Sequence, residues 1–548
     1  MLPLLQSVRS LFRRCLAPAM LAAVTAVVAR PVAAQDHAHP AGDPAELGTV
    51  EFPVSCDAAV QPDFERAVAM LHSFWFDAAG AAFEDIARRD PACALAHWGL
   101  AVAMMGNPMT RAAPGAEPLS AGAAAAQRAA ELVQNASHRE QMYVDAALAY
   151  YADYETRPHA ERMQAMAAAF DALRAAHADD MEATIFYART AIANAPPTDL
   201  TFARQIHAAE LLQPLFDAHQ DHPGLAHYLI HAYDAPALAA RATDAAFAYA
   251  DIAPAAPHAL HMPSHIFTRL GYWDESIETN ARSARAEPDS NAAVHPMDYL
   301  VYAYLQQGRD AEASAVVARA VQNPDRFYGG LLGYNFAAMP ARYALERDAW
   351  AEAAALRVPV GATPFVEAVT RFARAIGAAR EGNAEHARTE TAALAELQGK
   401  LVEQGDTYWA TIVEAQRLAA EAWIALASDD ADTALRVARE AADLEETVEK
   451  HPVTPGPILP ARELLGDMLM ALDRPADALI EYQATLTREP RRARTLAGAA
   501  RAARLAGNGA AATALYTELV DVMSSATAQR PELLEARAHL RTAGASQR

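Results

Sequence analysis

Lysine is almost absent from the 548 residues. It occurs only at Lys400 and Lys450, which leaves arginine to supply 44 of the 46 positive charges. The 68 acidic residues give the chain a net charge of −22. A field of that sign repels nucleic-acid backbones and anionic lipid surfaces, and it attracts cations. The charge therefore argues against a nucleic-acid partner and favours cationic partners, metal ions among them.

Aromatic residues and glycine are also scarce. Aromatics make up 7% of a chain that is 53% hydrophobic, and 33 prolines outnumber the 24 glycines. Alanine fills much of the apolar fraction, and small side chains of high helix propensity favour closely packed helices over a β-rich core. No convincing alternating strand pattern is present. The composition predicts an all-α protein whose helices are separated by proline-marked turns.

Long hydrophobic runs are missing, apart from one at the N-terminus that is too short for a typical membrane span. It covers residues 15–29, follows a cluster of arginines and precedes the small residues "VAA". This order predicts a signal peptide, residues 1–34, cleaved after Ala34. Its loss would remove four arginines and take the net charge from −22 to −26. We expect an exported mature chain without a transmembrane segment, periplasmic if the cell is Gram-negative.

Cysteine occurs three times, and Cys15 would leave with the signal peptide. Cys56 and Cys93 remain in the mature chain, at the edges of one predicted helical unit. Two cysteines in an oxidising compartment favour a disulfide. The alternative is two buried free thiols.

Several catalytic motifs are absent as well. The sequence has no glycine-rich phosphate loop, no nucleophile elbow and no CxxCH haem attachment. We therefore expect no nucleotide cofactor. No catalytic residue can be named, and whether the protein is an enzyme stays open.

What the chain does have is an internal repeat of about 34 residues. The segment 464–490 carries Leu-Gly, a small residue, an aromatic and a proline at fixed spacing. The positions that share this pattern are Leu465, Gly466, Ala478, Tyr482 and Pro490, then Ala512 and Tyr516, and near the N-terminus Ala79, Phe83 and Pro91. The pattern resembles the tetratricopeptide repeat family. The resemblance implies a right-handed superhelical solenoid of antiparallel helix pairs with a concave groove.

The repeats and their interruptions divide the chain into expected parts. These are the signal peptide 1–34, a flexible mature N-terminus 35–50, N-terminal helices 51–135, central repeats 136–330, further repeats 331–450, a proline-rich connection 451–461 and C-terminal repeats 462–548. In the connection, four prolines and a glycine predict a pause in the superhelix or a strap across its surface.

Histidines gather in the central repeats. Seven of the 19 lie in residues 222–295, and two series follow the repeat length. His227, His261 and His295 are 34 residues apart, and His231, His265 and Tyr299 form the second series. The family resemblance implies that His258, His261, His265 and Asp234 occupy helix positions lining the groove.

This spacing predicts a transition-metal site. His227 and His231 are stacked one helical turn apart, as are His261 and His265, and imidazoles from neighbouring helices can reach one ion. We expect these two pairs to form the site, with His258 or Asp234 in support. His295 and Tyr299, with the adjacent Asp298, would lie behind them or beside them as a further ligand.

The sequence indicates the ligands more clearly than it indicates which metal they bind. Met262 and Met297 adjoin the histidines, and histidine with methionine favours copper, whereas histidine with aspartate favours zinc or iron. A second copper site is possible at Gln35, Asp36 and His37, where a free amine with histidine third would chelate Cu(II) in a square plane.

The closest resemblance is to exported bacterial tetratricopeptide proteins with an HxxxH and PHALHMPSHIF signature, here 227–231 and 257–267. The sequence thus predicts a metal carrier or metalloenzyme that binds copper, zinc or iron in a histidine-rich groove. The alternative is a scaffold whose groove binds a peptide or a partner protein through neutral imidazoles.

Overall fold

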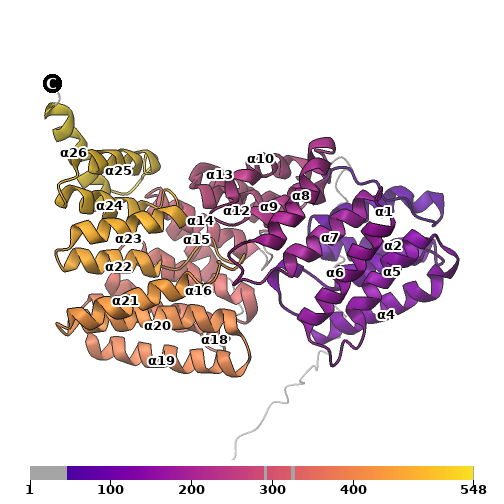
Figure 1. The fold of residues 1–548 in the computed structure, drawn as a ribbon, viewed down its shortest axis with the longest axis horizontal. Helices are drawn as coiled ribbons and strands as arrows, with labels where there is room; N and C mark the ends of the chain where they lie inside the picture. Colours follow the sequence, from indigo (N-terminus) through magenta and orange to yellow (C-terminus); the bar gives the residue numbers. More distant parts are fainter. Residues whose placement is uncertain (1–45, 289, 291–292, 323–327, 547–548) are drawn as a thin grey trace, which may run out of the picture. The chain divides into compact units, whose positions relative to one another are not determined.

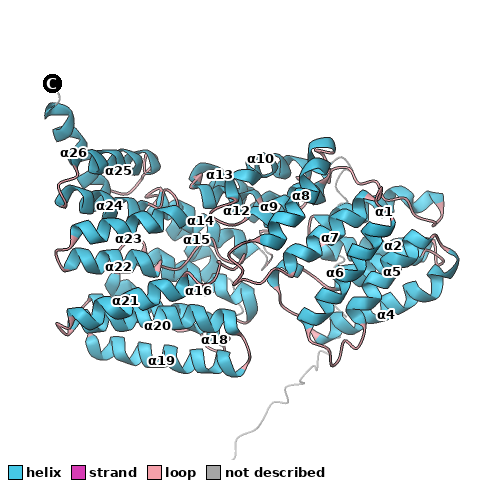
Figure 2. Ribbon diagram, viewed as in Figure 1, coloured by secondary structure: helices cyan, strands magenta, loops and turns pink. Residues whose placement is uncertain are grey.

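Helices joined by short turns make up the described chain, which contains no β-strand (Figure 2). The computed structural model describes residues 46–288, 290, 293–322 and 328–546. These belong to one compact unit, residues 43–548. The predicted signal peptide and the predicted copper ligands Gln35, Asp36 and His37 lie outside the described residues. None of the described helices is both long and apolar enough to cross a membrane.

The helices follow one another along the chain as labelled in Figure 1. The first are α1 (Gln61–His72), α2 (Phe76–Arg89), α3 (Ala94–Met104), α4 (Ala116–Leu132), α5 (His138–Tyr151), α6 (His159–Ala176), α7 (Met181–Ala193) and α8 (Ala203–Ala218). The central ones are α9 (Pro223–Tyr233), α10 (Thr243–Ile252), α11 (Pro257–His261), α12 (Pro263–Leu270), α13 (Trp273–Ala286), α14 (Val294–Gln306), α15 (Asp310–Gln322), α16 (Gly330–Leu345) and α17 (Trp350–Ala354). The last are α18 (Pro364–Arg380), α19 (Ala384–Glu403), α20 (Thr407–Ala427), α21 (Ala431–Glu445), α22 (Ala461–Ala471), α23 (Pro475–Arg488), α24 (Ala493–Leu505), α25 (Gly509–Val522) and α26 (Pro531–Ser546). Single 3-10 turns are η2 (Ala58–Val60), η3 (Pro108–Thr110), η4 (Val133–Asn135) and η5 (Ala239–Ala242).

Consecutive helices pack in antiparallel pairs, and each pair stacks on the next (Figure 1). The predicted repeat positions make the contacts within and between pairs. The Tyr482 side chain is 2% exposed and fits against Gly466 and Gly498, where any side chain would collide with its ring. Phe83 is buried in the same way against Gly99, and Tyr516 is fully buried. The predicted tetratricopeptide-like solenoid is therefore confirmed.

The turn within several helix pairs contains one residue with a positive φ angle. In the first pair it is Phe74, with φ 53°. In seven other pairs joined by a similarly short turn this residue is glycine or aspartate, namely Gly271, Gly308, Asp348, Gly382, Asp429, Asp473 and Gly507. An aromatic side chain at this position costs backbone energy that glycine avoids. Phe202, in the longer connection before α8, has φ 54° and bears the same cost.

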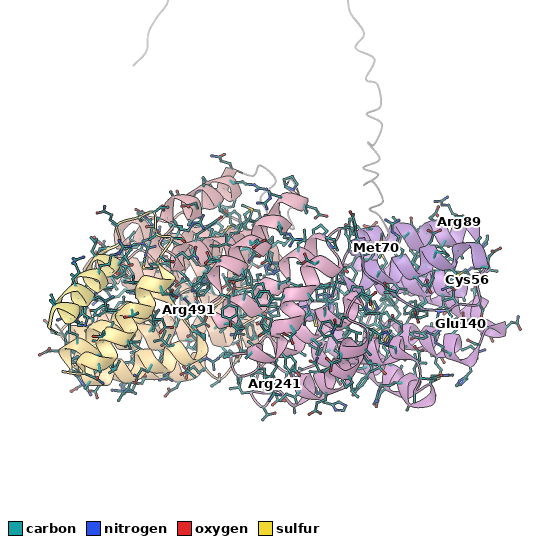
Figure 3. All side chains as sticks on the ribbon, turned by 90° about the horizontal axis from the view of Figure 1, so that it is seen from above. Cys56, Met70, Arg89, Glu140, Arg241 and Arg491 are labelled. Atoms are coloured by element: carbon teal, nitrogen blue, oxygen red, sulfur yellow. A yellow bond between two sulfur atoms is a disulfide. The ribbon has the colours of Figure 1, made fainter. Side chains whose placement is uncertain are left out.

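Cys56 and Cys93 form the predicted disulfide, with their sulfur atoms 2.02 Å apart. Cys56 lies in the segment before α1, and Cys93 is the residue before α3. The bond therefore ties both ends of the first helix pair together, close to Glu140 (Figure 3), whose carboxylate accepts a 2.7 Å hydrogen bond from the Ser55 amide.

The proline-rich connection runs through the interior of the solenoid. We call residues 446–460, between α21 and α22, the strap. Its Val453, Thr454 and Ile458 are buried, and its backbone carbonyls accept hydrogen bonds from side chains of α14 and α16. Arg342 of α16 donates to the carbonyls of Gly456 and Pro457, both at 2.7 Å. The connection thus fills the groove instead of lying across an outer surface.

Candidate metal centre

Four helices bring six histidines to one place in the solenoid. His227 and His231 lie on α9, His258 and His261 on α11, His265 on α12 and His295 on α14. Pro263 opens α12 at a position where a missing N–H costs no helix hydrogen bond, so α11 and α12 continue each other almost without a gap. His261 and His265 therefore remain one turn apart and face the same way.

The six histidines form two groups of three. The first triad is His227, His231 and His258, and the second triad is His261, His265 and His295. Within each triad, one nitrogen of every ring lies within 4.8 Å of the others. The grouping differs from the predicted one, in which His227, His231, His261 and His265 shared one ion; His295, predicted to lie behind them or beside them as a further ligand, belongs to the second triad.

Hydrogen bonds fix where the protons of the second triad sit. Nδ1 of His265 donates to the Asp234 carboxylate at 2.8 Å. Nδ1 of His261 donates to Oδ1 of Asn280 at 2.6 Å, and the amide of Asn280 is oriented by its own 2.6 Å donation to the Ser276 carbonyl. A neutral ring with a proton on Nδ1 has a bare lone pair on Nε2.

The two bare nitrogens of the second triad point at each other. Nε2 of His261 lies 3.0 Å from Nε2 of His265. Since neither carries a proton, this contact is a lone-pair repulsion instead of a hydrogen bond. Two nitrogens bound to one ion at about 2.0–2.1 Å each would also lie about 3 Å apart. The arrangement could hold a metal ion.

The first triad has a comparable, less constrained arrangement. Nδ1 of His227 donates to the His72 carbonyl at 2.5 Å, which leaves its Nε2 bare, 3.1 Å from Nε2 of His231. Here His231 can donate a proton across the contact. The Nε2 atom of His258, however, is buried without a hydrogen-bond partner among the described residues.

Burial keeps these imidazoles neutral. It lowers the pKa of His261 well below the usual histidine value, and neighbouring His265 lowers the pKa further, whereas the hydrogen bond that His261 donates to Asn280 raises it. Burial is also the main reason that the pKa of His227, His231 and His295 lies well below its usual range. Neutral imidazole is the form that binds metals, so the site stays competent into mild acid.

Asp234, predicted as a supporting residue, lies behind the second triad in contact with His265. Besides His265, its carboxylate binds Nε of Arg269 at 2.9 Å and Nζ of Lys450 at 3.0 Å. Burial alone would raise the pKa of Asp234, but Lys450 and Arg269 hold it well below its usual value. Asp234 is therefore an anion that orients the His265 ring, a role typical of carboxylates behind metal ligands.

The structure separates the remaining predicted supporting residues. Tyr299 packs its ring 4.9 Å from that of His261 and donates to the Thr454 carbonyl at 3.2 Å, so it lies beside the second triad. Asp298, by contrast, binds Nε of Arg342 at 3.1 Å and contacts no histidine, because its side chain leaves the helix on another face. Met262 and Met297 are buried in apolar cores, which removes the thioether argument for copper.

Sequence reasoning missed three contributors. Phe74 covers the first triad, with its ring stacked 5.3 Å from His258 and 4.3 Å from His227. Asn280 sets the proton position of His261, and Lys450 reaches Asp234 across 216 residues of sequence. Of these three residues, only Lys450 could have been singled out from the sequence, because it is one of two lysines and adjoins the proline-rich connection.

In a third buried group, the histidine nitrogens already have hydrogen-bond partners within the protein. Glu182 accepts from Nε2 of His72 and Nε2 of His222, both at 2.9 Å, while Nδ1 of His72 bonds to the Tyr228 hydroxyl at 3.0 Å. Burial would raise the pKa of Glu182, but the two histidines lower it to about 2. Both ring nitrogens of His72 have partners, so this group needs no ion to explain it.

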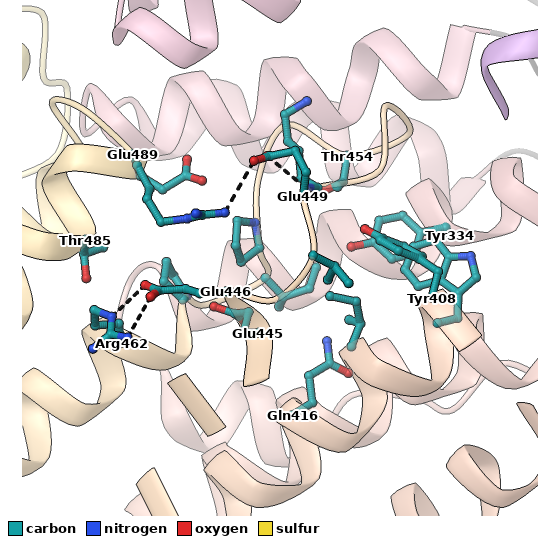
Figure 4. A pocket seen from close by; sticks show the side chains of 18 residues that line it. Tyr334, Tyr408, Gln416, Glu445, Glu446, Glu449, Thr454, Arg462, Thr485 and Glu489 are labelled. Atoms are coloured by element: carbon teal, nitrogen blue, oxygen red, sulfur yellow. Dashed lines mark hydrogen bonds and ion pairs between the residues drawn. The ribbon is translucent and has the colours of Figure 1, made fainter. Parts of the chain in front are cut away.

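Three cavities lie at or near the centre, and one of them, of about 60 Å³, is lined by His231 and Asp234 together with Lys450. Another, of about 160 Å³, is lined by His258, His261 and His295 together with Phe74 and Glu287, and so borders both triads. The third, of about 60 Å³, lies between the strap and the C-terminal helices (Figure 4). It carries Glu445, Glu449 and Glu489 beside Tyr334 and Tyr408.

Comparison with known proteins adds little to this description. Neither a protein-family model nor a curated protein sequence matches the chain. A solved structure, the crystal structure of the APC/C hetero-tetramer Cut9–Hcn1, contains a chain that matches with 12% identity and a TM-score of 0.29, over 88% of this chain and 89% of that one. At this distance the match carries no weight, and the tetratricopeptide-like assignment rests on the helix pairs themselves.

Proposed function

We propose that this protein is an exported metal-binding solenoid that holds a divalent transition metal in its histidine cluster, as a metal carrier or a metalloenzyme. The observation that carries the proposal is the pair of bare Nε2 atoms, 3.0 Å apart, in the buried second triad. Both Nδ1 protons are committed to Asn280 and Asp234, so a metal ion or an extra proton between the rings relieves the repulsion, and burial of the rings disfavours the proton. Export to the periplasm is proposed from the N-terminal sequence pattern alone.

The donor set narrows the choice of metal. Three neutral imidazoles suit zinc, copper, iron and nickel, and the affinity order for such ligands favours copper. Neither triad contains a carboxylate, and Asp234 is turned away to bind Arg269 and Lys450, so the oxygen-rich ligand set that magnesium or calcium needs is not offered. Copper and zinc are therefore the leading candidates, with iron possible.

The direct test is the metal content of the full-length chain, with zinc or copper added and the excess removed. We expect retained metal in the wild type and a rise in the thermal midpoint, since an ion at 100 times its Kd stabilises by about 2.7 kcal/mol. His261→Ala should abolish both effects. His219→Ala, at the exposed end of α8, is the matched control and should change neither.

A milder variant separates binding from folding. Asn280→Leu keeps the volume but leaves the proton of His261 without its acceptor, so the ring is no longer fixed in its ligating form. Loss of such a partner lowers metal affinity about 10–100-fold without removing a ligand. Wild-type protein that shows no metal-dependent shift with copper, zinc or iron would defeat the proposal.

The second candidate is a scaffold that binds a peptide or partner protein, which the tetratricopeptide-like fold favours. The groove beside α9, α12, α14 and α16 is already filled by the strap. A partner would have to displace the strap or use another surface. This candidate becomes the better account if the metal tests are negative.

A further inference from the structure

The two triads lie against each other. The ring centroids of His231 and His265 are 6.1 Å apart, and those of His258 and His261 are also 6.1 Å apart. In each pair, one ring belongs to the first triad and the other to the second, so the triads meet at two points. Ions that share a bridging ligand lie about 3.5–4 Å apart, and ligand rings at this spacing can serve two such ions.

Each triad also leaves room for a ligand that the protein does not supply. Three protein ligands leave a catalytic-type metal with an open position. The 160 Å³ cavity is lined by His258 from the first triad and by His261 and His295 from the second. The open positions of both triads therefore face one shared space.

Each triad contains a buried nitrogen that nothing in the described chain satisfies. These are Nε2 of His258 and Nδ1 of His295, both at the wall of the shared cavity. Other buried atoms of the described chain also lack a partner, but these two lie beside the other ring nitrogens of their triads. Each can offer a lone pair to an ion held by its triad.

We propose that the two triads load together as a dinuclear centre whose ions share a small bridging ligand, hydroxide or another small anion, in the common cavity. The inference rests on the proposed metal-binding function and extends it from one ion to two. A ring of Phe74 over His258 and His227 keeps the first ion away from bulk water. We expect the bridging ligand to be a small ion because the shared cavity has a small volume.

The test loads the full-length chain with Cu(II), removes the excess and measures copper per chain together with the electron paramagnetic resonance signal. We expect two coppers per chain and a strongly reduced signal, since a bridging ligand couples the two spins. One copper per chain overturns the inference and leaves the proposed function intact. No copper defeats both, and two coppers with a full signal show independent sites and overturn the bridge.

A variant confirms which residues hold the second ion. His258→Ala should bind one copper per chain and recover a full signal for that ion, whereas His219→Ala should behave as the wild type. Added azide should alter the optical spectrum of the wild type by replacing the bridge and should not restore the signal. A His258→Ala protein that keeps two coupled coppers overturns the inference, and thermal unfolding of the metal-free variants checks that each is folded.

Discussion

Substitutions at Phe74 separate two contributions to stability: the free-energy cost of its positive φ angle, and the contacts that its side chain makes with the histidines. The residue has φ 53° and is 8% exposed, in the turn position that seven other helix pairs fill with glycine or aspartate. Removing a buried phenylalanine side chain costs about 3–5 kcal/mol. Both Phe74→Ala and Phe74→Gly should therefore destabilise the metal-free protein.

The difference in unfolding free energy between the two variants measures the cost of the left-handed backbone conformation. A left-handed conformation costs an L-residue about 1–2 kcal/mol that glycine does not incur. Phe74→Gly should thus be more stable than Phe74→Ala by about 1 kcal/mol. At the exposed helical position Glu210 of α8 the order should reverse, with Glu210→Ala more stable than Glu210→Gly by about 0.5–1 kcal/mol.

The assay is urea unfolding of all four variants without metal, followed by metal-release rates for the two Phe74 variants. Both should release metal faster than the wild type, and to a similar extent, because both uncover the first triad. Phe74→Ala matching or exceeding Phe74→Gly in stability would refute the account of a strained turn. Unchanged release rates would refute the covering role of the ring.

Three further predictions concern other parts of the chain. Cys56→Ser opens a disulfide that spans 37 residues and should cost about 4 kcal/mol in the chain-entropy model; a thermal midpoint equal to that of the oxidised wild type would contradict this. Burial is the main cause that raises the pKa of Glu445 from 4.5 to about 7, so the native state binds its proton more tightly and stability falls as the pH rises from 4.5 to 7. Glu445→Gln should thus gain up to about 3 kcal/mol over the wild type at pH 8 and almost nothing at pH 4, measured by urea unfolding at both values. Gly498→Ala places a carbon 2.6 Å from the Tyr482 ring and should cost about 1–3 kcal/mol, whereas Gly399→Ala, with nothing within 4 Å, should gain about 0.5–1 kcal/mol in the same assay.

Features that repeat every 34 residues could be predicted from the sequence. Tyr482 and Tyr516 mark contacts between neighbouring helices, and those contacts need only local spacing to be inferred. The gathering of histidines followed from the same periodicity. Their division into two triads did not, because His258 and His261 are three apart on one helix and point about 60° apart, toward different neighbours.

Contacts between distant repeats could not be predicted. Helix α1 touches α9, and this brings Phe74 over His227 from 153 positions earlier in the sequence. Such contacts depend on how the small rotation between successive pairs accumulates, which no single repeat encodes. The position of the strap could not be predicted either. Its prolines indicate that the repeat pattern is interrupted, but they do not determine which helices the strap packs against.

The strap gives the protein an order of assembly. In an open repeat array each unit folds on its neighbour as it emerges, but here Lys450 closes onto Asp234 across 216 residues. Closing a loop of that length costs about 5 kcal/mol of chain entropy, so closure is a late and cooperative event. The carboxylate behind His265 gains its lysine partner only when nearly the whole chain is present. A chain halted before residue 450 would lack this contact, so metal binding, if it occurs as proposed, would require an almost complete chain.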